Sequence, residues 1–259
     1  EYEIMFIHLN THSVYSPMRG LLSLSDLMNL SQSYGMDTLA LTDVNGMWGF
    51  IRFVQHCKDA GIRPIAGTNL ITENDDVILL AENQYGYENM CRAVSAVHDN
   101  SKQSITDILE KQLAGLFVLS HKESTLNKLI NIIPYTHLFL ELRPGIQEIY
   151  MQKLAKKFKL EMVVTGDVYF RSQSDHDAHV TLRAIEKNTT LKQLDIAECK
   201  TNHHWFRSEA EMVKLFPNSL DGLNNSQYLA DRCKTDWSFI NTIFPGLSLK
   251  ETHISNKKL

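Results

Sequence analysis

Cysteine is scarce in this chain of 259 residues. The four cysteines, Cys57, Cys91, Cys199 and Cys233, stand far apart and form no C-x-x-C pair. Widely spaced single cysteines argue against a structural zinc site and against a disulfide framework. We therefore expect a protein of a reduced, cytoplasmic compartment.

Long apolar runs and an excess of positive charge are also missing. No stretch approaches the roughly 18 uninterrupted apolar residues of a membrane span, and we expect no signal peptide. With 26 basic and 30 acidic side chains, the net charge is −4, which gives no general attraction for phosphate backbones. We expect no membrane contact, and DNA contact only through a local patch or a neighbouring domain.

Short apolar runs alternate with amphipathic segments along most of the chain. This pattern is typical of βα units around a parallel sheet or barrel, and a hydrophobic fraction of 43% supports one large core. The predicted strands are 4–9, 38–41, 64–71, 77–81, 116–119, 138–142 and 161–164. The predicted helices are 24–35, 47–60, 87–97, 147–158, 176–186, 208–215 and 219–233.

The last part of the sequence has a different character. From Pro245 onwards the apolar periodicity is lost and polar residues gather. We therefore expect one domain over residues 1–245 and a linker or tail over residues 246–259.

Polar residues stand at the ends of several predicted strands, where functional groups of βα barrels usually lie. The first strand delivers His8, Asn10 and His12, which share one side of an extended segment because side chains two apart face the same way. The others are Asp43, Asn45, Thr68, Asn69, His121, Lys122, Asp167 and Tyr169.

Ordinary structural roles compete with a site for most of these residues. His8 also fits a packing histidine, and Asp43 and Asp167 also fit turn or helix-cap residues. Adjacent residues point to different sides, so a surface loop is the simpler interpretation of His203 and His204. A third ligand is lacking near His176 and His179, which favours hydrogen bonding over a zinc pair.

The order of motifs resembles the N-terminal PHP (polymerase and histidinol phosphatase) domain of C-family bacterial DNA polymerases, meaning the DNA polymerase III alpha subunit and its error-prone relative. The resemblance covers residues 4 to about 245. The segments that carry it are Phe6 to Ser16, Leu39 to Asp43, Gly46 to Gly49, Ala60 to Gly67, Ile78 to Asn83, Tyr85 to Arg92, Thr165 to Tyr169 and Asp175 to Ile185.

The resemblance implies a distorted, seven-stranded, TIM-like βα barrel with extra C-terminal helices. In intact members the rim holds a cluster of divalent metals that activates water for phosphoester hydrolysis. Carried over position by position, the ligand pattern is incomplete in this chain. The positions that depart from it are Asn10, Val44, Asn69, Lys122 and Tyr169.

The residual metal-ligand candidates are His12, Asp43 and Asp167, followed by His8 and His121. Such a reduced set implies at most one weakly bound divalent metal ion, whether zinc, manganese or magnesium. The neutral replacements also relieve repulsion between carboxylates, and Tyr169 is expected to hydrogen-bond Asp43 or His12.

Three functions remain open at the level of sequence. The leading hypothesis is a degenerate domain that supports the core of a DNA-directed DNA polymerase, a transferase of DNA replication, in the same full-length chain. A proofreading exonuclease subunit, and DNA through the parent protein, are the further partners expected. The alternatives are an active metal-dependent 3′–5′ exonuclease or phosphoesterase with an altered ligand set that recruits His8, His121 or His176, and a free-standing binding module.

Overall fold

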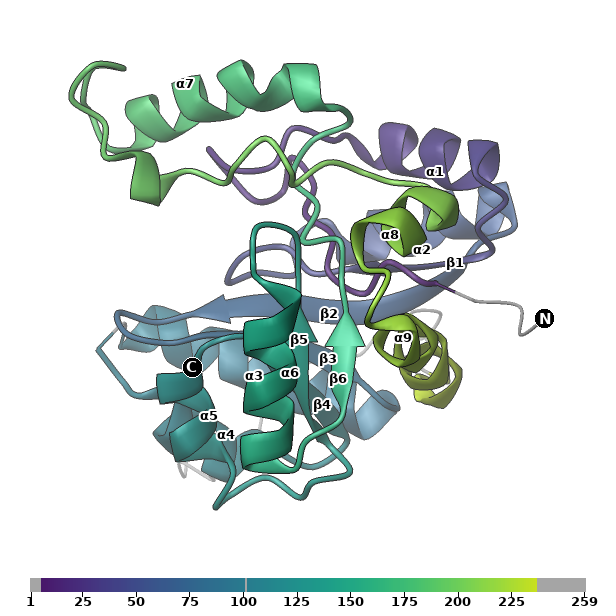
Figure 1. The fold of residues 1–259 in the computed structure, drawn as a ribbon, viewed down its shortest axis with the longest axis vertical. Coiled ribbons are helices and arrows are strands. Elements are labelled where there is room, and N and C mark those ends of the chain that lie inside the picture. The colour runs from purple at the N-terminus through teal and green to yellow at the C-terminus, as the bar shows by residue number, and fades with distance from the viewer. Residues whose placement is uncertain (1–5, 101, 237–259) are drawn as a thin grey trace, which may run out of the picture.

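Six strands form one curled sheet in the order in which they occur along the chain, from β1 to β6 (Figure 1). The computed structural model describes residues 6–100 and 102–236. The strands are β1 (Thr38–Leu41), β2 (Arg63–Ile71), β3 (Asp76–Ala81), β4 (Leu116–Ser120), β5 (Leu138–Leu142) and β6 (Met162–Val164). Six of the seven predicted strands are therefore confirmed, with boundaries that shift by one residue at most.

The sheet is mixed. β1 pairs parallel with β2, and β4, β5 and β6 pair parallel with one another, whereas β3 runs antiparallel to both β2 and β4. The short turn after β2 explains this arrangement, because only an antiparallel neighbour can be reached without a long crossover. The β2–β3 hairpin thus interrupts the regular βα alternation that the sequence predicts.

The predicted first strand is not a strand in its described part, residues 6–9. The segment of residues 6–12 instead bridges the two edges of the sheet through a few backbone hydrogen bonds. On one side Ala40 N donates to His8 O at 3.0 Å and Thr42 N donates to Thr11 O at 2.8 Å. On the other side His12 N donates to Val168 O at 2.8 Å and Val168 N donates to Asn10 O at 3.0 Å. Because this pairing includes only an isolated bridge between Thr11 and Val168, the seven-stranded barrel is not confirmed.

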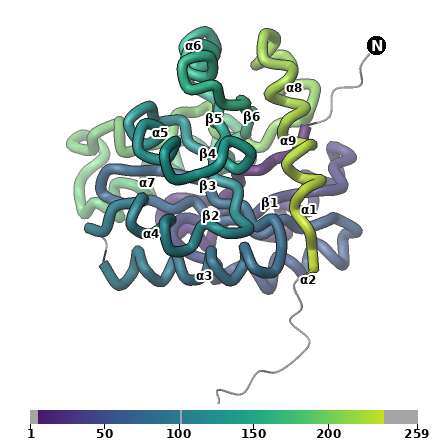
Figure 2. Tube along the Cα trace, turned by 90° about the horizontal axis from the view of Figure 1, so that it is seen from below, coloured from purple at the N-terminus to yellow at the C-terminus, as the bar shows by residue number. Residues whose placement is uncertain are grey.

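The α-helices of the described residues surround the curled sheet (Figure 2). All seven predicted helices are present, and two short ones, α4 and α5, were not predicted. The helices are α1 (Leu24–Ser33), α2 (Phe50–Ala60), α3 (Gln84–Asp99), α4 (Ile105–Gln112), α5 (Glu123–Leu129), α6 (Glu148–Phe158), α7 (His176–Glu186), α8 (Glu209–Leu215) and α9 (Leu220–Arg232).

Local sequence explains where several helices begin. Ser23 and Asp26 form a capping box at the start of α1, and Ser208 and Glu211 form another at the start of α8. Each box satisfies backbone N–H groups that have no partner inside the helix. Helix α2 ends at Gly61, whose φ of 70° is the left-handed conformation that glycine adopts without strain.

Alternation along the strands divides the core into two parts. Leu39 and Leu41 face the surrounding helices, whereas Ala40 faces the inside of the curl, where a second apolar cluster gathers. The end of α9 belongs to this inner cluster, and Arg63, the first residue of β2, donates to the carbonyl oxygen of Cys233 at 3.0 Å. Helix α9 therefore closes the inside of the curl near the start of β2.

The opposite end of the sheet is polar and is covered by a separate layer. Helix α7 lies beyond the C-terminal ends of β5 and β6, and the chain after it folds back towards the sheet (Figure 1). We call residues 195–201 the strap; it contains the short 3₁₀ helix Ile196–Glu198. None of the helices among residues 6–100 and 102–236 is long and apolar enough to cross a membrane. The predicted tail, residues 246–259, lies outside the described residues.

Candidate functional site: a polar cluster at the sheet rim

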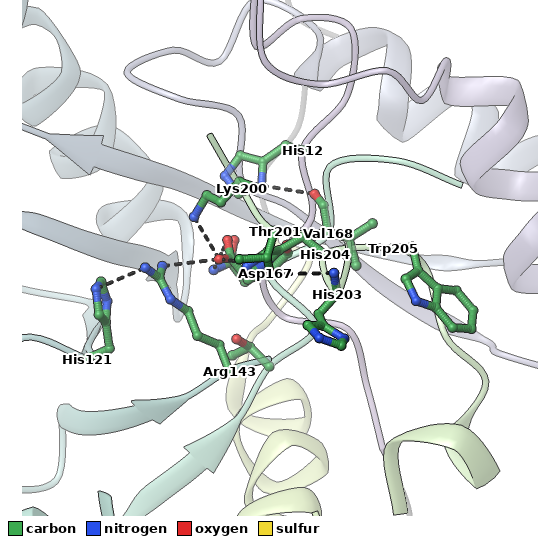
Figure 3. A network of polar contacts seen from close by, with 12 residues as sticks. His12, His121, Arg143, Asp167, Val168, Lys200, Thr201, His203, His204 and Trp205 are labelled. Carbon is green, nitrogen blue, oxygen red and sulfur yellow. Dashed lines mark hydrogen bonds and ion pairs between the residues drawn. The ribbon is translucent and has the colours of Figure 1, made fainter. Parts of the chain in front are cut away.

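Asp167 is the centre of a buried polar cluster at the ends of β5 and β6 (Figure 3). Its Oδ2 atom lies 2.7 Å from Lys200 Nζ, 3.2 Å from Arg143 Nη1 and 3.1 Å from His204 Nδ1. The backbone of Asp167 has a φ of 43°, a left-handed conformation that is uncommon outside glycine. Such a backbone conformation persists only where many surrounding contacts hold the residue in place.

Glu141 forms the second carboxylate of the cluster. Its Oε1 atom accepts hydrogen bonds from Asn10 Nδ2 at 2.8 Å and from Thr165 Oγ1 at 2.7 Å. Its Oε2 atom lies 3.6 Å from His121 Nδ1, and His121 Nε2 accepts a hydrogen bond from Arg143 at 2.9 Å. Asn10 therefore donates its side-chain amide to a carboxylate of the cluster.

A third carboxylate, Asp76, completes the charge pattern. Its Oδ1 atom accepts a hydrogen bond from Asn69 Nδ2 at 2.6 Å, and its Oδ2 atom lies 3.8 Å from Arg143 Nη1. Arg143 thus contacts both Asp76 and Asp167. The cluster contains three carboxylates and two basic side chains, Arg143 and Lys200. Burial and the neighbouring Arg143 lower the pKa of Lys200, and Asp167 offsets part of this effect.

The acid pKa values follow from this arrangement. Burial acts to raise the pKa of Asp167, but Arg143 and Lys200 outweigh burial and hold it well below its ordinary value. Arg143 and Lys200 also outweigh burial at Asp76 and lower its pKa. At Glu141, the His121 side chain and Arg143 outweigh burial and lower the pKa. Burial acts to lower the pKa of Arg143, and its three acidic neighbours raise it above its ordinary value. The cluster is therefore ionised at neutral pH.

His12 lies beside the cluster with one ring nitrogen free. Its ring stacks on Tyr169 with 3.9 Å between centroids, and Nδ1 lies 3.0 Å from the carbonyl oxygen of Val168. A carbonyl only accepts, so Nδ1 carries the proton and Nε2 presents a lone pair. That Nε2 atom is buried and has no hydrogen-bond partner among the described residues. Burial is the main cause that lowers the pKa of His12 to about 4, so the ring is neutral at pH 7.

The expected hydrogen bond of Tyr169 to Asp43 or His12 is wrong. The buried Tyr169 hydroxyl has no hydrogen-bond partner among the described residues. Stacking on His12 holds the ring in place, and the Lys200 ammonium lies 4.7 Å from the ring centroid. The phenol therefore contributes an aromatic surface to the site, and Asn10 and Arg143 make the polar links.

Asp43 lies in a separate hydrogen-bond group. Its carboxylate accepts from Ser13 N at 2.7 Å, from Ser13 Oγ at 2.9 Å and from Ser16 Oγ at 2.6 Å. Burial raises the pKa of this carboxyl, and the serine hydrogen bonds offset part of the rise. Asp43 therefore organises the loop of residues 13–20, as the competing turn interpretation proposed.

The remaining departures from the family pattern have ordinary structural partners. Val44 and Asn69 form a parallel bridge, which links the end of β1 to β2. Lys122 is the residue before α5, and its backbone N donates to Ser120 Oγ at 3.4 Å. The cations that lie within hydrogen-bonding distance of Asp167 are instead Arg143 and Lys200.

His8 serves packing. Its Nε2 lies 2.8 Å from the carbonyl oxygen of Arg207, and its ring lies against Phe206 with 4.3 Å between centroids. Burial lowers the pKa of His8 to about 4. A Cβ on Gly166 would come within 2.5 Å of His8 Nδ1, so only glycine fits before Asp167.

His176 and His179 are hydrogen-bond partners, as predicted. His179 Nδ1 donates to Arg19 O at 2.8 Å, which leaves Nε2 to accept from Lys200 N at 3.0 Å. His176 Nε2 lies 3.0 Å from Lys200 O and donates to it. The two histidines thus fix the backbone of the strap on both sides of Lys200.

His204 corrects the sequence interpretation. His203 is exposed, as expected for a surface loop, but His204 is buried and contacts Asp167 through both the carboxylate and the backbone oxygen. Burial lowers the pKa of His204, with a partial offset by Asp167. The side chains of His203 and His204 do point in opposite directions, and the side chain of His204 points into the polar cluster.

A cavity of ≈ 280 Å³ opens above the cluster and is lined by Arg19, Arg183, Glu198, Lys200 and Tyr169. Its outer cations are also paired. Arg183 Nη2 lies 3.2 Å from Glu198 Oε2, and Arg19 Nη2 lies 3.6 Å from Glu186 Oε1. The rim thus provides acidic and basic groups that compensate one another.

A divalent metal ion does not fit this donor set as it stands. Asp167 Oδ2 already accepts from two cations and an imidazole, and a metal ligand must offer a free lone pair. Within residues 6–100 and 102–236, no group of three or more His, Cys, Asp or Glu side chains could hold a metal ion. Among the described residues, the buried imidazole nitrogens that have no hydrogen-bond partner are His8 Nδ1, His12 Nε2 and His121 Nδ1.

A family model described as PHP domain matches residues 8–161, more than half of the chain. The chain belongs to the PHP domain family. Among curated proteins, it is 29% identical over 265 residues to DNA polymerase III subunit alpha of Pasteurella multocida (strain Pm70), covering 89% of this chain and 23% of that protein. The Escherichia coli (strain K12) protein of the same name is 29% identical over 266 residues, with the same coverage. The chain thus spans less than a quarter of the length of these relatives.

A solved structure was also matched, at lower sequence identity. It is a two-domain protein from Bacteroides vulgatus containing a predicted PHP-like metal-dependent phosphoesterase. The TM-score is 0.45 at 16% sequence identity, and the match covers 72% of this chain and 56% of that chain.

Sequence reasoning missed Glu141, Arg143, Asp76, Lys200 and His204. The sequence did contain a signal for Glu141 and Arg143. Both stand at the C-terminal end of the predicted strand 138–142, where functional residues of βα barrels usually lie. Lys200 had no such signal. It comes from the irregular strap, whose position depends on the tertiary contacts of His176 and His179.

Proposed function

We propose that this chain is the PHP domain of a DNA polymerase III alpha subunit, with a degenerate hydrolytic site and a structural role that supports the polymerase core of the same protein. The observation that carries the proposal is the neutralisation of Asp167 by Lys200 and Arg143, two cations of the chain itself. Similarity to alpha subunits over 89% of the chain supports the assignment to this protein family.

Charge compensation supports a structural role because it removes the need for a metal ion. A rim with several buried carboxylates and no cation would be destabilised by repulsion and desolvation. Here the compensating charges are covalently part of the fold, and the segment of residues 6–12 takes the place of a seventh strand. The domain would comprise residues 1–245, with residues 246–259 leading to the core; a proofreading exonuclease subunit and DNA would meet the parent protein.

A nuclease assay tests the proposal against the enzyme alternative. The purified chain is incubated with end-labelled single-stranded DNA and Mn²⁺, and release of nucleotides from the 3′ end is measured. We expect no turnover above a protein-free control. Turnover that disappears in His12→Ala would show instead that the rim is an active metal-dependent exonuclease with an altered ligand set.

The supporting role needs a measurement on the full-length polymerase. Asp167→Asn in the full-length protein should lower the temperature at which polymerase activity is lost on heating, because it destabilises the domain on which the core rests. The exposed substitution Asp221→Asn is the matched control. Equal thermal inactivation of both variants and the wild type would contradict a supporting role.

A further inference from the structure

A second cavity, of ≈ 470 Å³, lies where β4 and β5 begin, at the end of the sheet opposite to the polar cluster. We call it the α3–α4 cavity, because the start of α3 and the end of α4 form two of its walls and the loop before β5 forms the third. Its aromatic and apolar lining comes from Tyr85, Leu113, Ala114 and Pro134. The lining side chains Glu110 and Lys111 carry opposite charges. The cavity therefore suits an uncharged, apolar occupant.

The walls of this cavity are held together by close contacts. Asn89 Nδ2 donates to the carbonyl oxygen of Ala114 at 2.8 Å, which joins α3 to the loop after α4. A Cβ on Gly86 would collide with the carbonyl oxygen of Gly115, so the two backbones touch at this point. At the same place Tyr85 is 58% exposed. A preformed cavity of this size, within the range of about 300–1,000 Å³ typical of binding pockets, is thus bordered by an uncovered aromatic ring.

The chain runs towards this cavity as it leaves α9. Lys234 N donates to the carbonyl oxygen of Glu82 at 2.8 Å. Two residues later, Asp236 Oδ1 accepts from Gln84 N at 2.7 Å. Residues 234 and 236 thus advance beside residues 82 and 84 in the same direction. The next residue on that path is Tyr85, which lines the cavity.

The sequence that follows Asp236 has the chemistry that the cavity suits. Residues 237–249 contain no charged side chain. Five of the nine residues 237–245 are large and apolar, namely Trp237, Phe239, Ile240, Ile243 and Phe244. Removing such side chains from water is favourable in proportion to the apolar area that is buried. A segment joined directly to the edge of a cavity also has an effective concentration in the millimolar range, which favours it over a separate partner.

We propose that residues 237–245 bind in the α3–α4 cavity of the same chain, with Trp237 against Tyr85. This inference deepens the proposed function and rests on it, because a segment held there sets the direction in which the chain leaves the domain towards the polymerase core. The cavity is then an intramolecular docking site, and Asp236 is the residue that positions the segment at its entrance.

Tryptophan fluorescence of the 259-residue chain tests the docking directly. In a background of Trp48→Phe and Trp205→Phe, the emission comes from Trp237 alone. We expect blue-shifted emission and protection from acrylamide quenching, and Tyr85→Ser should shift the emission to the red and raise the quenching constant several-fold. Tyr150→Ser is the matched control, because Tyr150 also stands in the first turn of a helix, is 45% exposed and does not line the cavity; it should change neither quantity.

Thermal unfolding of the chain with Trp48 and Trp205 intact gives a second reading, which decides alone if the background variants do not fold. Tyr85→Ser and Trp237→Ser should each lower the Tm by about 3–6 °C, as expected for losing a tenfold excess of bound over free segment. The double variant should lose no more than the larger single loss, because both changes release the same segment.

Three results would overturn the proposal. The first is quenching of Trp237 as free as in urea, or unchanged by Tyr85→Ser. The second is additive losses of Tm in the double variant, or no loss in either single variant. The third is protection of Trp237 that disappears on dilution together with a dimer in sedimentation, which would make a second copy the occupant. None of these measurements depends on nuclease or polymerase activity, so failure of the docking is distinguishable from failure of the proposed function.

Discussion

Asp43 and Asp167 follow two strands of the same sheet and were candidates for the same metal site, yet their environments differ. Asp43 is surrounded by neutral donors from Ser13 and Ser16, and burial raises its pKa. Asp167 is surrounded by cations, and its pKa lies well below the ordinary value. The comparison teaches that two buried aspartates at one sheet rim can serve different purposes, one as a loop anchor and the other as part of an ion network.

The largest difference between the two regions should appear when each aspartate is neutralised. Asp167→Asn leaves Lys200 and Arg143 without their shared carboxylate, and uncompensated buried charges cost about 3–5 kcal/mol. Urea unfolding of the 259-residue chain measures this loss of unfolding free energy. A loss no greater than that of the exposed control Asp221→Asn would show that the network contributes nothing.

A smaller loss of folding stability is expected when the pH is lowered. It arises from His12, which lies beside the Asp167 cluster. The folded pKa of His12 is about 4, below its unfolded value near 6.5. The unfolded state therefore binds the proton first, so the stability contributed by neutral His12 is complete above pH 6.5 and is lost as pH falls towards 4. This loss amounts to roughly 2–3 kcal/mol.

His12→Phe isolates that contribution because phenylalanine keeps the stacking on Tyr169 and cannot titrate. Its unfolding free energy should fall less steeply than that of the wild type between pH 6.5 and 4. His203→Phe removes an exposed histidine and serves as the control. Identical pH profiles for the wild type and His12→Phe would contradict a depressed pKa for His12.

Asp43→Asn should cost less than Asp167→Asn. The amide retains one acceptor oxygen but presents a donor to the serine groups, and an unsatisfied buried hydrogen bond costs about 1–3 kcal/mol. The contribution of Asp43 to the unfolding free energy should also change with pH in the opposite direction to that of His12. Because burial raises the folded pKa of Asp43, its contribution favours folding at low pH and is lost as pH rises through that pKa. Unfolding free energies at pH 4 and pH 7 measure both effects, and a cost equal to that of Asp167→Asn would remove the distinction.

The smallest effect is expected at the outer edge of the strap. Lys187 pairs with Glu198 at 3.1 Å, and both side chains are more than a third exposed. Exposed pairs contribute about 0–1 kcal/mol, so Lys187→Ala should change the unfolding free energy only slightly. A loss comparable to that of Lys200→Ala would mean that the strap as a whole, and not the Lys200 ammonium, stabilises the rim.

The sequence predicts most of the framework but only part of the site. Strands such as 38–41 and 138–142 were predicted to the residue, because each is a short apolar run bounded by polar residues. The segment of residues 6–9 was wrongly predicted as a strand, since its isolated bridge depends on where the two sheet edges come to lie. Asp167, a predicted metal-ligand candidate, lies at the centre of the polar cluster. Its partner Lys200 was not, because 33 residues separate the two and only folding of the strap brings them together.

Metal content tests the central claim, that cations of the chain itself replace a divalent metal on this rim. The wild-type protein is exposed to excess Mn²⁺ and Zn²⁺, dialysed, and analysed by inductively coupled plasma mass spectrometry alongside Asp167→Asn. We expect the wild type to retain far less than one equivalent of metal, because the donors of Asp167 are already occupied. A stoichiometric metal in the wild type that is lost in Asp167→Asn would contradict the account.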